Sequence, residues 1–414
     1  MRNILIFTML SFVMSAEKTF VACEGNFYQS NGSIWTIEEN EVFEYSDNPL
    51  GEIVQALYVY QNELYLTVNG SHKIYVFDIT DNELIEKHSI DTNYSSPREM
   101  LVYDNHLYFS NWYSADIKKI DLNSWEIVNE ISMPGLPEDI VLHDGKLFIS
   151  ITMNYDWTDG DKVVALDPSI DSIVATYDVG SGPGDLLVHD DEIFVSRTYY
   201  DEKWNAFYGT SKIDRSGSVM SANYGAGTAC GGSVMSYQNS VYRVFDGGIA
   251  KLDENLMIMP ETRIGDFNAG DVYTVDVHDD YIYFGLTDFS YPDQVVVVNS
   301  NGAIVEEYDV GVAPGDFAYW EACIANGDIN NDNQLNVGDI VAAVPYVLVD
   351  SLGYNCTIDL NSDGIINVVD IVMMVQEVLN INSFRGAVNW LDKHIPELKA
   401  KDRLRKLSLP LNKS

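Results

Sequence analysis

The chain has 414 residues, and its 63 acidic residues outnumber its 24 basic residues to give a formal net charge of -39. Nucleic acids and anionic membranes are themselves polyanions, so this charge argues against both as partners and favours cations or neutral ligands. A hydrophobic content of 46% excludes a disordered chain, and the length suits one large domain with a small one.

The first residues have the pattern of a secretory signal. Arg2 precedes an apolar run from Ile4 to Val13, and small residues follow up to Ala16. This order is typical of a signal peptide, so we expect residues 1–16 to be removed and the mature protein to be secreted, extracellular or cell-surface associated. The run is too short to cross a bilayer and no other stretch is long and apolar enough, so no transmembrane segment is expected.

A strand, a tight polar turn and a second strand recur six times after this signal, every 40 to 48 residues. Repeats of this length, rich in Tyr, Val and Ile, are typical of the four-stranded blades of a β-propeller, whereas a parallel β-helix needs shorter repeats. The six copies are Leu57–Leu66, Met100–Phe109, Ile140–Ile149, Leu186–Val195, Val234–Val244 and Val275–Phe284.

A seventh blade is predicted to be split between the two ends of this domain, which we place at residues 19–322. Thr19–Cys23, Ser33–Thr36 and Glu41–Tyr45 would be its outer strands, and Phe317–Trp320 its innermost strand. Pairing the two ends in this way closes the ring and removes exposed sheet edges.

Short phrases in the repeats resemble the YVTN-type surface-layer propellers of secreted bacterial proteins. Val21–Asn26, Ile74–Asp78 and Pro183–Asp185 carry this likeness. The resemblance implies a binding or scaffolding domain without a fixed catalytic set.

Aligning the repeats places a carboxylate at the start of the innermost strand in four of the seven blades. These residues are Glu99, Asp139, Asp185 and Asp316, and Ala56, Ser233 and Thr274 take the same position elsewhere. Loops expected on the same face carry Trp112, Trp157 and Trp204. Rings beside carboxylates suit a sugar, a cationic group or a protein. An alternative stays open, in which the acids cap turn amides and the rings fill gaps between blades.

His143, His189 and His278 share another repeat position, which Tyr60, Tyr103 and Tyr237 occupy in other blades. We interpret it as a packing position with a polar tip rather than a metal set. No nucleophile elbow, phosphate-binding loop or His-Glu-x-x-His motif is found, so an enzyme is uncertain and less favoured.

Two twelve-residue segments, 328–339 and 359–370, share one pattern of oxygen-bearing residues and start 31 residues apart. Asp, Asn and Asp stand at positions 1, 3 and 5, Asn at position 9 and Asp at position 12, which is the pattern of a calcium loop. An apolar stretch of helical period follows each loop, and Leu335 and Ile366 are placed to pack the two loops together. Because carboxylates crowd each loop, ion binding is expected to drive folding of this module.

This duplicated loop and helix resembles the type I dockerin module, over about residues 324–381. The resemblance implies two Ca2+ ions and a cohesin-like partner module. The implied ligands are Asp328, Asn330, Asp332, Gln334 (carbonyl), Asn336 and Asp339 in the first loop and Asp359, Asn361, Asp363, Ile365 (carbonyl), Asn367 and Asp370 in the second.

The module also departs from the family pattern. Asn333 stands where Gly is preferred, and Pro345 is expected to kink or end the first helix. Val337-Gly338 and Val368-Val369 occupy the partner-choosing positions 10 and 11, which are often hydroxyl-bearing in this family. They could meet a hydrophobic cohesin or pack on the propeller.

The four cysteines divide into two groups. Cys323 and Cys356 precede the two loops and are expected to form a disulfide, while Cys23 and Cys230 are expected to be buried thiols. Phe20 to Cys23 faintly resembles a lipoprotein cleavage box, but the charged Glu17 before it argues against lipidation.

Residues 382–414 form a basic tail, with eight basic and three acidic residues. We expect it to dock on the acidic body, with export or surface retention as the alternative.

The sequence thus predicts a mainly β protein, a seven-bladed β-propeller with a small α-helical calcium-binding dockerin-like module. The expected function is recognition of a glycan or protein ligand by the propeller and attachment to a cohesin-bearing partner. The alternative is a dockerin-targeted glycoside hydrolase or lyase that degrades polysaccharide at the propeller mouth.

Overall fold

A computed structural model describes residues 17–80, 82–227, 233–322, 325–330, 334–348, 355–361 and 365–379. The chain divides into two compact units, one ending at Ala322 and the other beginning at Cys323. The predicted signal peptide, the basic tail and Cys230 lie outside the described residues.

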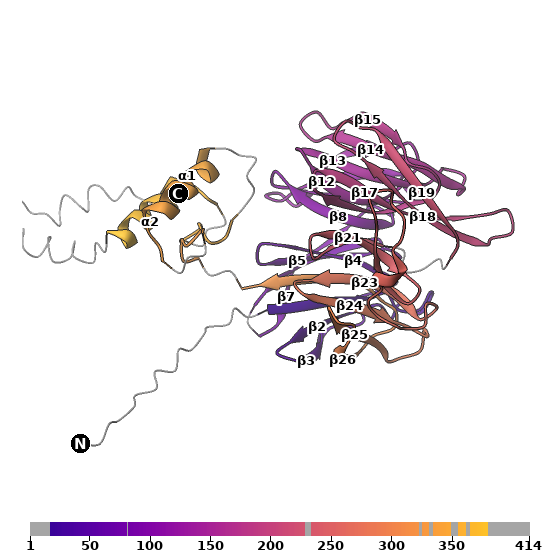
Figure 1. Cartoon of the computed structure of the whole chain (residues 1–414). Helices are drawn as coiled ribbons and strands as arrows, with labels where there is room; N and C mark the ends of the chain where they lie inside the picture. The colour runs from indigo at the N-terminus through magenta and orange to yellow at the C-terminus, as the bar shows by residue number, and fades with distance from the viewer. Residues whose placement is uncertain are drawn as a thin grey trace, which may run out of the picture. The chain divides into compact units, whose positions relative to one another are not determined.

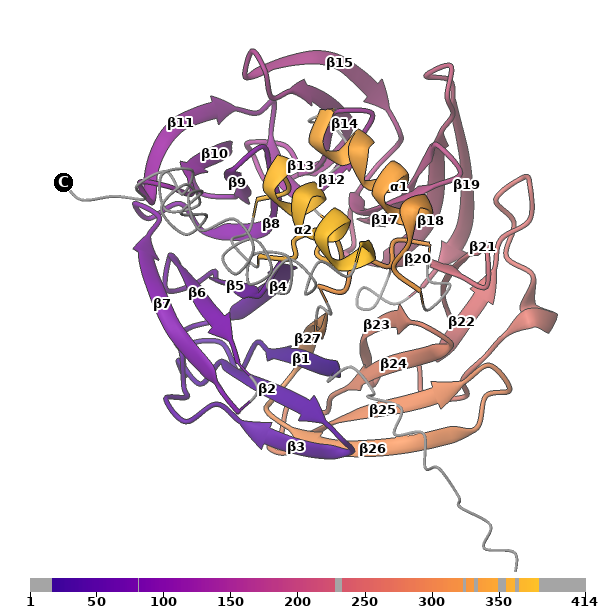
Figure 2. The same cartoon turned by 90° about the vertical axis from the view of Figure 1, so that its left-hand side faces the viewer.

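The first unit is a ring of seven antiparallel sheets (Figure 2), which confirms the predicted propeller. Three blades follow each other in the first half of the chain, each with its innermost strand first in sequence. They are β4 (Val54–Tyr60), β5 (Glu63–Val68), β6 (Lys73–Ile79) and β7 (Leu84–Asp91); β8 (Pro97–Tyr103), β9 (His106–Asn111), β10 (Asp116–Asp121) and β11 (Glu126–Ser132); and β12 (Leu136–His143), β13 (Lys146–Met153), β14 (Asp159–Asp167) and β15 (Ser172–Asp178).

Three more blades complete the part of the ring that lies between the termini. They are β16 (Pro183–His189), β17 (Glu192–Tyr200), β18 (Ala206–Ile213) and β19 (Val219–Ala226); β20 (Val234–Tyr237), β21 (Ser240–Phe245) and β22 (Gly248–Lys251); and β23 (Val272–His278), β24 (Tyr281–Leu286), β25 (Asp293–Asn299) and β26 (Ile304–Val310). The β20–β22 sheet has three strands, and a short 3-10 helix η1 (Pro260–Thr262) follows it.

The ring closes through the predicted split blade. β27 (Pro314–Glu321) pairs antiparallel with β1 (Glu17–Cys23), and β2 (Ser33–Glu38) and β3 (Glu41–Glu44) complete that sheet. In Figure 2 the orange β27 lies beside the indigo β1, so the two ends of the propeller domain share one sheet. This pairing removes two free edges.

The hydrophobic core lies between neighbouring blades. For example, Leu101 and Ile117 of the β8–β11 blade pack in one cluster with Ile140, Leu147 and Ile149 of the next blade. Alternating strand residues supply such a cluster on each face of a sheet, which explains the Val, Ile and Tyr content.

The tight turns predicted from the repeats are also present. The six predicted turn residues all have positive φ, which an Asp or Gln in a two-residue hairpin adopts at modest cost. They are Gln61, Asp104, Asp144, Asp190, Gln238 and Asp279.

The second unit contains two helices, α1 (Val337–Leu348) and α2 (Val368–Val378), as its described regular structure (Figure 1). Ala343, Ile358 and Met374 are fully buried in its small core, and the predicted Leu335 and Ile366 pack against them. α1 continues three residues beyond Pro345, so the expectation that proline ends this helix is wrong. No helix among the described residues is long and apolar enough to cross a membrane.

The cysteines follow the predicted division as far as they are described. Cys356 is disulfide-bonded, and its predicted partner Cys323 lies outside the described residues. Cys23 is a free thiol, fully buried inside β1, where burial raises its pKa.

Candidate functional site

Six of the seven innermost strands are irregular near their beginning, and all four of the repeated carboxylates lie in such strands. Register shifts interrupt the pairing between Pro97 and Met100, Pro137 and Ile140, and Pro183 and Leu186. A β-bulge re-aims side chains, and here it leaves a backbone N–H without a ladder partner.

A hydroxyl on the neighbouring strand accepts a hydrogen bond from that N–H in four blades. The donor–acceptor distances are 3.1, 3.1, 3.0 and 2.9 Å for Ala56 N to Thr67 Oγ1, Glu99 N to Ser110 Oγ, Asp139 N to Ser150 Oγ and Asp185 N to Ser196 Oγ. The repeated hydroxyl therefore fixes the backbone that carries Glu99, Asp139 and Asp185.

The four predicted carboxylates line one cavity of about 510 Å³ at the ends of the innermost strands. They are joined there by Glu24, Glu138 and Asp276, which the repeat alignment missed. Arg98 is the one basic residue among the described residues that line it. Seven carboxylates against one guanidinium make this cavity strongly electronegative.

Enclosure and mutual repulsion raise the pKa of most of these acids. Desolvation, and then the charge of Asp185, raise the pKa of Asp139 to about 7. Desolvation raises the pKa of Asp185 and of Asp276 to about 6 each. The pKa values of Glu99 and Asp316 are also raised, first by desolvation and then by neighbouring carboxylates.

The hydrogen bonds divide the four predicted acids into two roles. Asp139 Oδ2 accepts from Leu186 N, and Asp316 Oδ2 accepts from Leu57 N, each at 2.6 Å. These two carboxylates thus cap strand amides of other blades, whereas the alternative interpretation expected them to cap turn amides. In the part of the chain that the structure describes, the carboxylates of Glu99 and Asp185 accept no hydrogen bond, so both are available to a ligand.

An aromatic hollow of about 440 Å³ opens on the same face. It is lined by Tyr94, Trp112, Tyr113, Ser114, Ala115, Leu136, Tyr155 and Trp157. Trp112 and Trp157 meet edge to face, with ring centroids 6.0 Å apart. The Arg98 guanidinium stacks 4.2 Å from the Trp112 ring and pairs with Glu138, so one side chain links the hollow to the acidic cavity.

Several exposed aromatic residues on this face have a left-handed backbone. They are Tyr28, Tyr94, Trp157, Trp204 and Phe289, with φ between 59° and 66°, and each is more than half exposed. A bulky residue in this conformation is unfavourable by about 1–2 kcal/mol.

Comparison with other hairpins shows that nothing in this fold requires these rings. Gly217 and Gly302 occupy the same position in hairpins with the same backbone hydrogen bonds as those of Trp157 and Trp204. Leu256 also takes this position, but its side chain is buried in a core cluster, which offsets the strain. The exposed tryptophans have no such compensation from burial.

The predicted tryptophans are only partly brought together. Trp112 and Trp157 share the hollow, whereas Trp204 is 79% exposed and contacts Tyr200. Glu138 could have been found from the sequence because it directly precedes Asp139, but Glu24 and Asp276 follow no shared repeat position.

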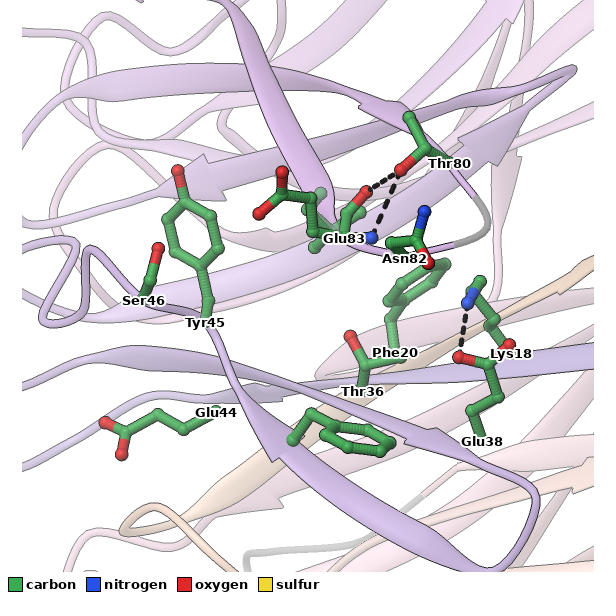
Figure 3. Close-up of a pocket in the computed structure, with 12 residues that line it drawn as sticks. Lys18, Phe20, Thr36, Glu38, Glu44, Tyr45, Ser46, Thr80, Asn82 and Glu83 are labelled. Atoms are coloured by element: carbon green, nitrogen blue, oxygen red, sulfur yellow. Dashed lines mark hydrogen bonds and ion pairs between the residues drawn. The ribbon is translucent and has the colours of Figure 1, made fainter.

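A second hollow, of about 210 Å³, lies between the closing blade and the β4–β7 blade (Figure 3). Phe20 and Leu84 are buried in it, and Lys18 pairs with Glu38. The Thr80 hydroxyl donates to the Glu83 carbonyl at 2.6 Å, which fixes the turn on one side. The sequence analysis did not predict this pocket, and it has no part in the function proposed below.

The two predicted calcium loops bury carboxylates in the second unit. Asp339, Asp359 and Asp370 are at most 1% exposed and Asp328 is 7% exposed. Residues 323–384 contain no Lys, Arg or His that could neutralise them. A buried carboxylate requires a compensating charge, and this segment contains no basic residue to supply it, so the donor set fits a bound cation.

The closing residue of each loop is held by backbone amides. Asp339 accepts from Ile329 N, Asn330 N and Asn336 N at 3.1, 3.3 and 2.9 Å. Asp370 Oδ2 accepts from Asn367 N at 2.9 Å, but its buried Oδ1 has no hydrogen-bond partner among the described residues. A buried carboxylate oxygen that accepts no hydrogen bond from the described residues is able to coordinate a metal ion. Asp332 and Asp363 lie outside the described residues.

Both helices leave an apolar row exposed. Val337, Val341 and Leu348 of α1 are 63 to 73% exposed, and Val368 and Val372 of α2 are 63% and 48% exposed. The rows begin at the same loop position in both halves, so the module presents a duplicated apolar surface.

No family model and no curated protein matches this sequence. Solved structures share the propeller fold at low identity. A candidate 6-phosphogluconolactonase from Bacteroides uniformis is 13% identical over 74% of this chain and 100% of its own, with a TM-score of 0.55. A second one from Bacteroides fragilis is 12% identical over 75% and 99%, with a TM-score of 0.53. AztD from Citrobacter koseri is 11% identical over 74% and 98%, with a TM-score of 0.50. These likenesses concern the fold alone.

Proposed function

We propose that this chain is a secreted, calcium-binding modular protein. Its propeller binds a glycan at the acidic and aromatic face, and its dockerin-like unit attaches it to a cohesin-bearing partner. The observation that carries the proposal is the burial of Asp328, Asp339, Asp359 and Asp370 in a segment without any basic residue. Oxygen ligands alone, closely spaced in two equivalent loops, suit Ca2+.

The attachment role rests on the duplicated apolar rows of α1 and α2. A monomeric protein rarely keeps such a surface exposed unless a partner covers it. The test is capture of the full chain on an immobilised type I cohesin module, with calcium and with a chelator. Capture is expected only with calcium and is expected to be lost in the Asp328→Ala, Asp359→Ala double variant. Capture that persists in the chelator would refute the attachment role.

The glycan role rests on the strained, exposed rings beside unpaired carboxylates. Aromatic faces stack on the apolar faces of sugars, and carboxylates accept hydrogen bonds from hydroxyl groups. The strongly negative cavity disfavours anionic polysaccharides. We therefore expect neutral polysaccharides to bind and pectate or alginate not to bind.

Affinity electrophoresis through gels that contain neutral β-glucan, xylan or mannan tests this role. Glu99→Gln, Asp185→Asn and Trp112→Ala are expected to lose retention, because each removes a group that faces the cavity or the hollow. Phe43→Ala is the matched control, since Phe43 is an exposed ring that lines the other pocket. Equal retention of all variants would contradict the proposed site.

A polysaccharide-degrading enzyme is the second candidate. Its support is the pKa of Asp139, raised to about 7, which would keep a protonated carboxylic acid near neutral pH as a general acid requires. Release of reducing ends from a bound polysaccharide, lost in Asp139→Asn, would favour the enzyme. Retention without products would favour the binding protein.

A further inference from the structure

One histidine on the propeller meets carboxylates from two other strands, at the opposite ends of the strands from the acidic cavity. His278 is the last residue of β23, Glu17 is the first residue of β1, and Glu321 is the last residue of β27. His278 Nε2 lies 3.2 Å from Glu17 Oε1 and 3.9 Å from Glu321 Oε1. One ligand atom each from Glu17, His278 and Asp279 lie within 4.8 Å of one another.

The imidazole of His278 is held in place by ring stacking, but one of its nitrogens lacks a hydrogen bond among the described residues. Its ring stacks on Tyr319 with centroids 4.1 Å apart and planes 3° apart. Its Nε2 is buried and, within the described part of the chain, makes no aligned hydrogen bond. Buried polar groups are nearly always hydrogen-bonded, so a buried ring nitrogen that lies beside carboxylates without a hydrogen bond needs an explanation.

The other two histidines at this repeat position differ. His189 Nδ1 lies 3.0 Å from the Ser236 hydroxyl, and its Nε2 lies 3.6 Å from Asp190, which is mostly exposed. His143 lies against Phe148. These two fit the predicted packing position with a polar tip, whereas His278 lies beside a group of potential metal ligands.

We propose that Glu17, His278 and Asp279 form a binding site for a first-row transition metal ion of the Zn2+ class, with Glu321 within reach as a fourth ligand. Imidazole nitrogen with carboxylate oxygens is a typical zinc donor set, while Ca2+ takes oxygen ligands only. Two ligands of a tetrahedral zinc lie about 3.3 Å apart, given bonds of about 2.0 Å. The 3.2 Å between His278 Nε2 and Glu17 Oε1 matches that separation.

A metal ion here would join the sixth blade to the closing blade. β23 belongs to one sheet, whereas β1 and β27 form the pair that closes the ring. Because the ligands come from both sheets, binding would favour the closed ring and raise the midpoint of thermal unfolding. This site is independent of the calcium loops and of the proposed glycan surface.

The test uses the full chain without a polyhistidine tag, in saturating Ca2+ so that the oxygen-only loops are already occupied. Zn2+ is titrated by calorimetry, and Co2+ serves as a spectroscopic probe of coordination. One zinc equivalent is expected. His278→Ala and Glu17→Gln are each expected to weaken zinc binding at least about tenfold and to remove the Co2+ absorption bands.

His143→Ala is the matched control, because it removes a histidine from the same repeat position without touching these carboxylates, and it should bind zinc as the unaltered chain does. Glu17 is nearly half exposed, so Glu17→Gln remains informative if His278→Ala fails to fold. Zinc binding that is absent, or that is equal in all variants, would overturn the proposal.

Discussion

Replacing Asp139 by Asn is expected to change how the stability of the propeller depends on pH. Asp139 has an ordinary pKa near 3.8, and the fold raises this value to about 7. A carboxyl whose pKa is raised by folding stabilises the native state when protonated, and this contribution is lost as the pH rises through the folded pKa. Asn carries no charge and keeps an acceptor for Leu186 N, while the acceptor for Ile140 N is lost, a change that does not depend on pH.

The size of the effect follows from the two pKa values. Ionising Asp139 in the folded state costs up to about 4 kcal/mol relative to low pH, because folding raises its pKa from 3.8 to about 7. At pH 6, about one pH unit below the folded pKa, protonation regains roughly 1 kcal/mol of this. The free energy of unfolding of the unaltered chain should therefore fall by about that amount more than the variant's between pH 6 and pH 9.

Denaturant unfolding at constant ionic strength, followed by tryptophan fluorescence, measures this difference. Asp156→Asn is the control, because Asp156 is exposed and its pKa is lowered by bonds to Thr158, so it stays ionised throughout this range. Identical pH profiles for Asp139→Asn and the unaltered chain would refute the reasoning.

Two further variants separate binding from stability. Trp157→Gly relieves a left-handed backbone and deletes an exposed ring. Thermal unfolding should therefore show equal or higher stability, by up to about 1 kcal/mol, while polysaccharide retention falls. Lower stability would show that the ring packs in the fold. Ser150→Ala leaves the bulge amide of Asp139 without its acceptor, so denaturant unfolding should show a loss of about 1–3 kcal/mol, and an unchanged midpoint would contradict the role of this hydroxyl.

The sequence predicts the architecture well because hairpins and periods are local signals. The turn residues Asp104 and Asp144 have the positive φ that their type favours, and the Phe317–Trp320 phrase lies in the strand that closes the ring. Of the two effects predicted for Pro345, a kink or an end, the end is wrong, because a helix can continue past proline when its other side chains pack.

The candidate site is less predictable because it depends on how blades converge. Repeat alignment finds Glu99 and Asp185, but not Glu24, which follows β1 of the closing blade and reaches the cavity only when the ring closes. Likewise, no pattern separates Asp139, which caps another blade's amide, from Asp185, which accepts no bond in the described structure. The left-handed tryptophans are also invisible to a sequence pattern, because Gly fills the same position in other hairpins.

The most direct measurement is calorimetric titration of Ca2+ into the chelator-treated full chain. The buried aspartates predict heat for two ions, with one ion lost in Asp328→Ala and the other in Asp359→Ala. A titration without heat, or one that both variants leave unchanged, would contradict the account.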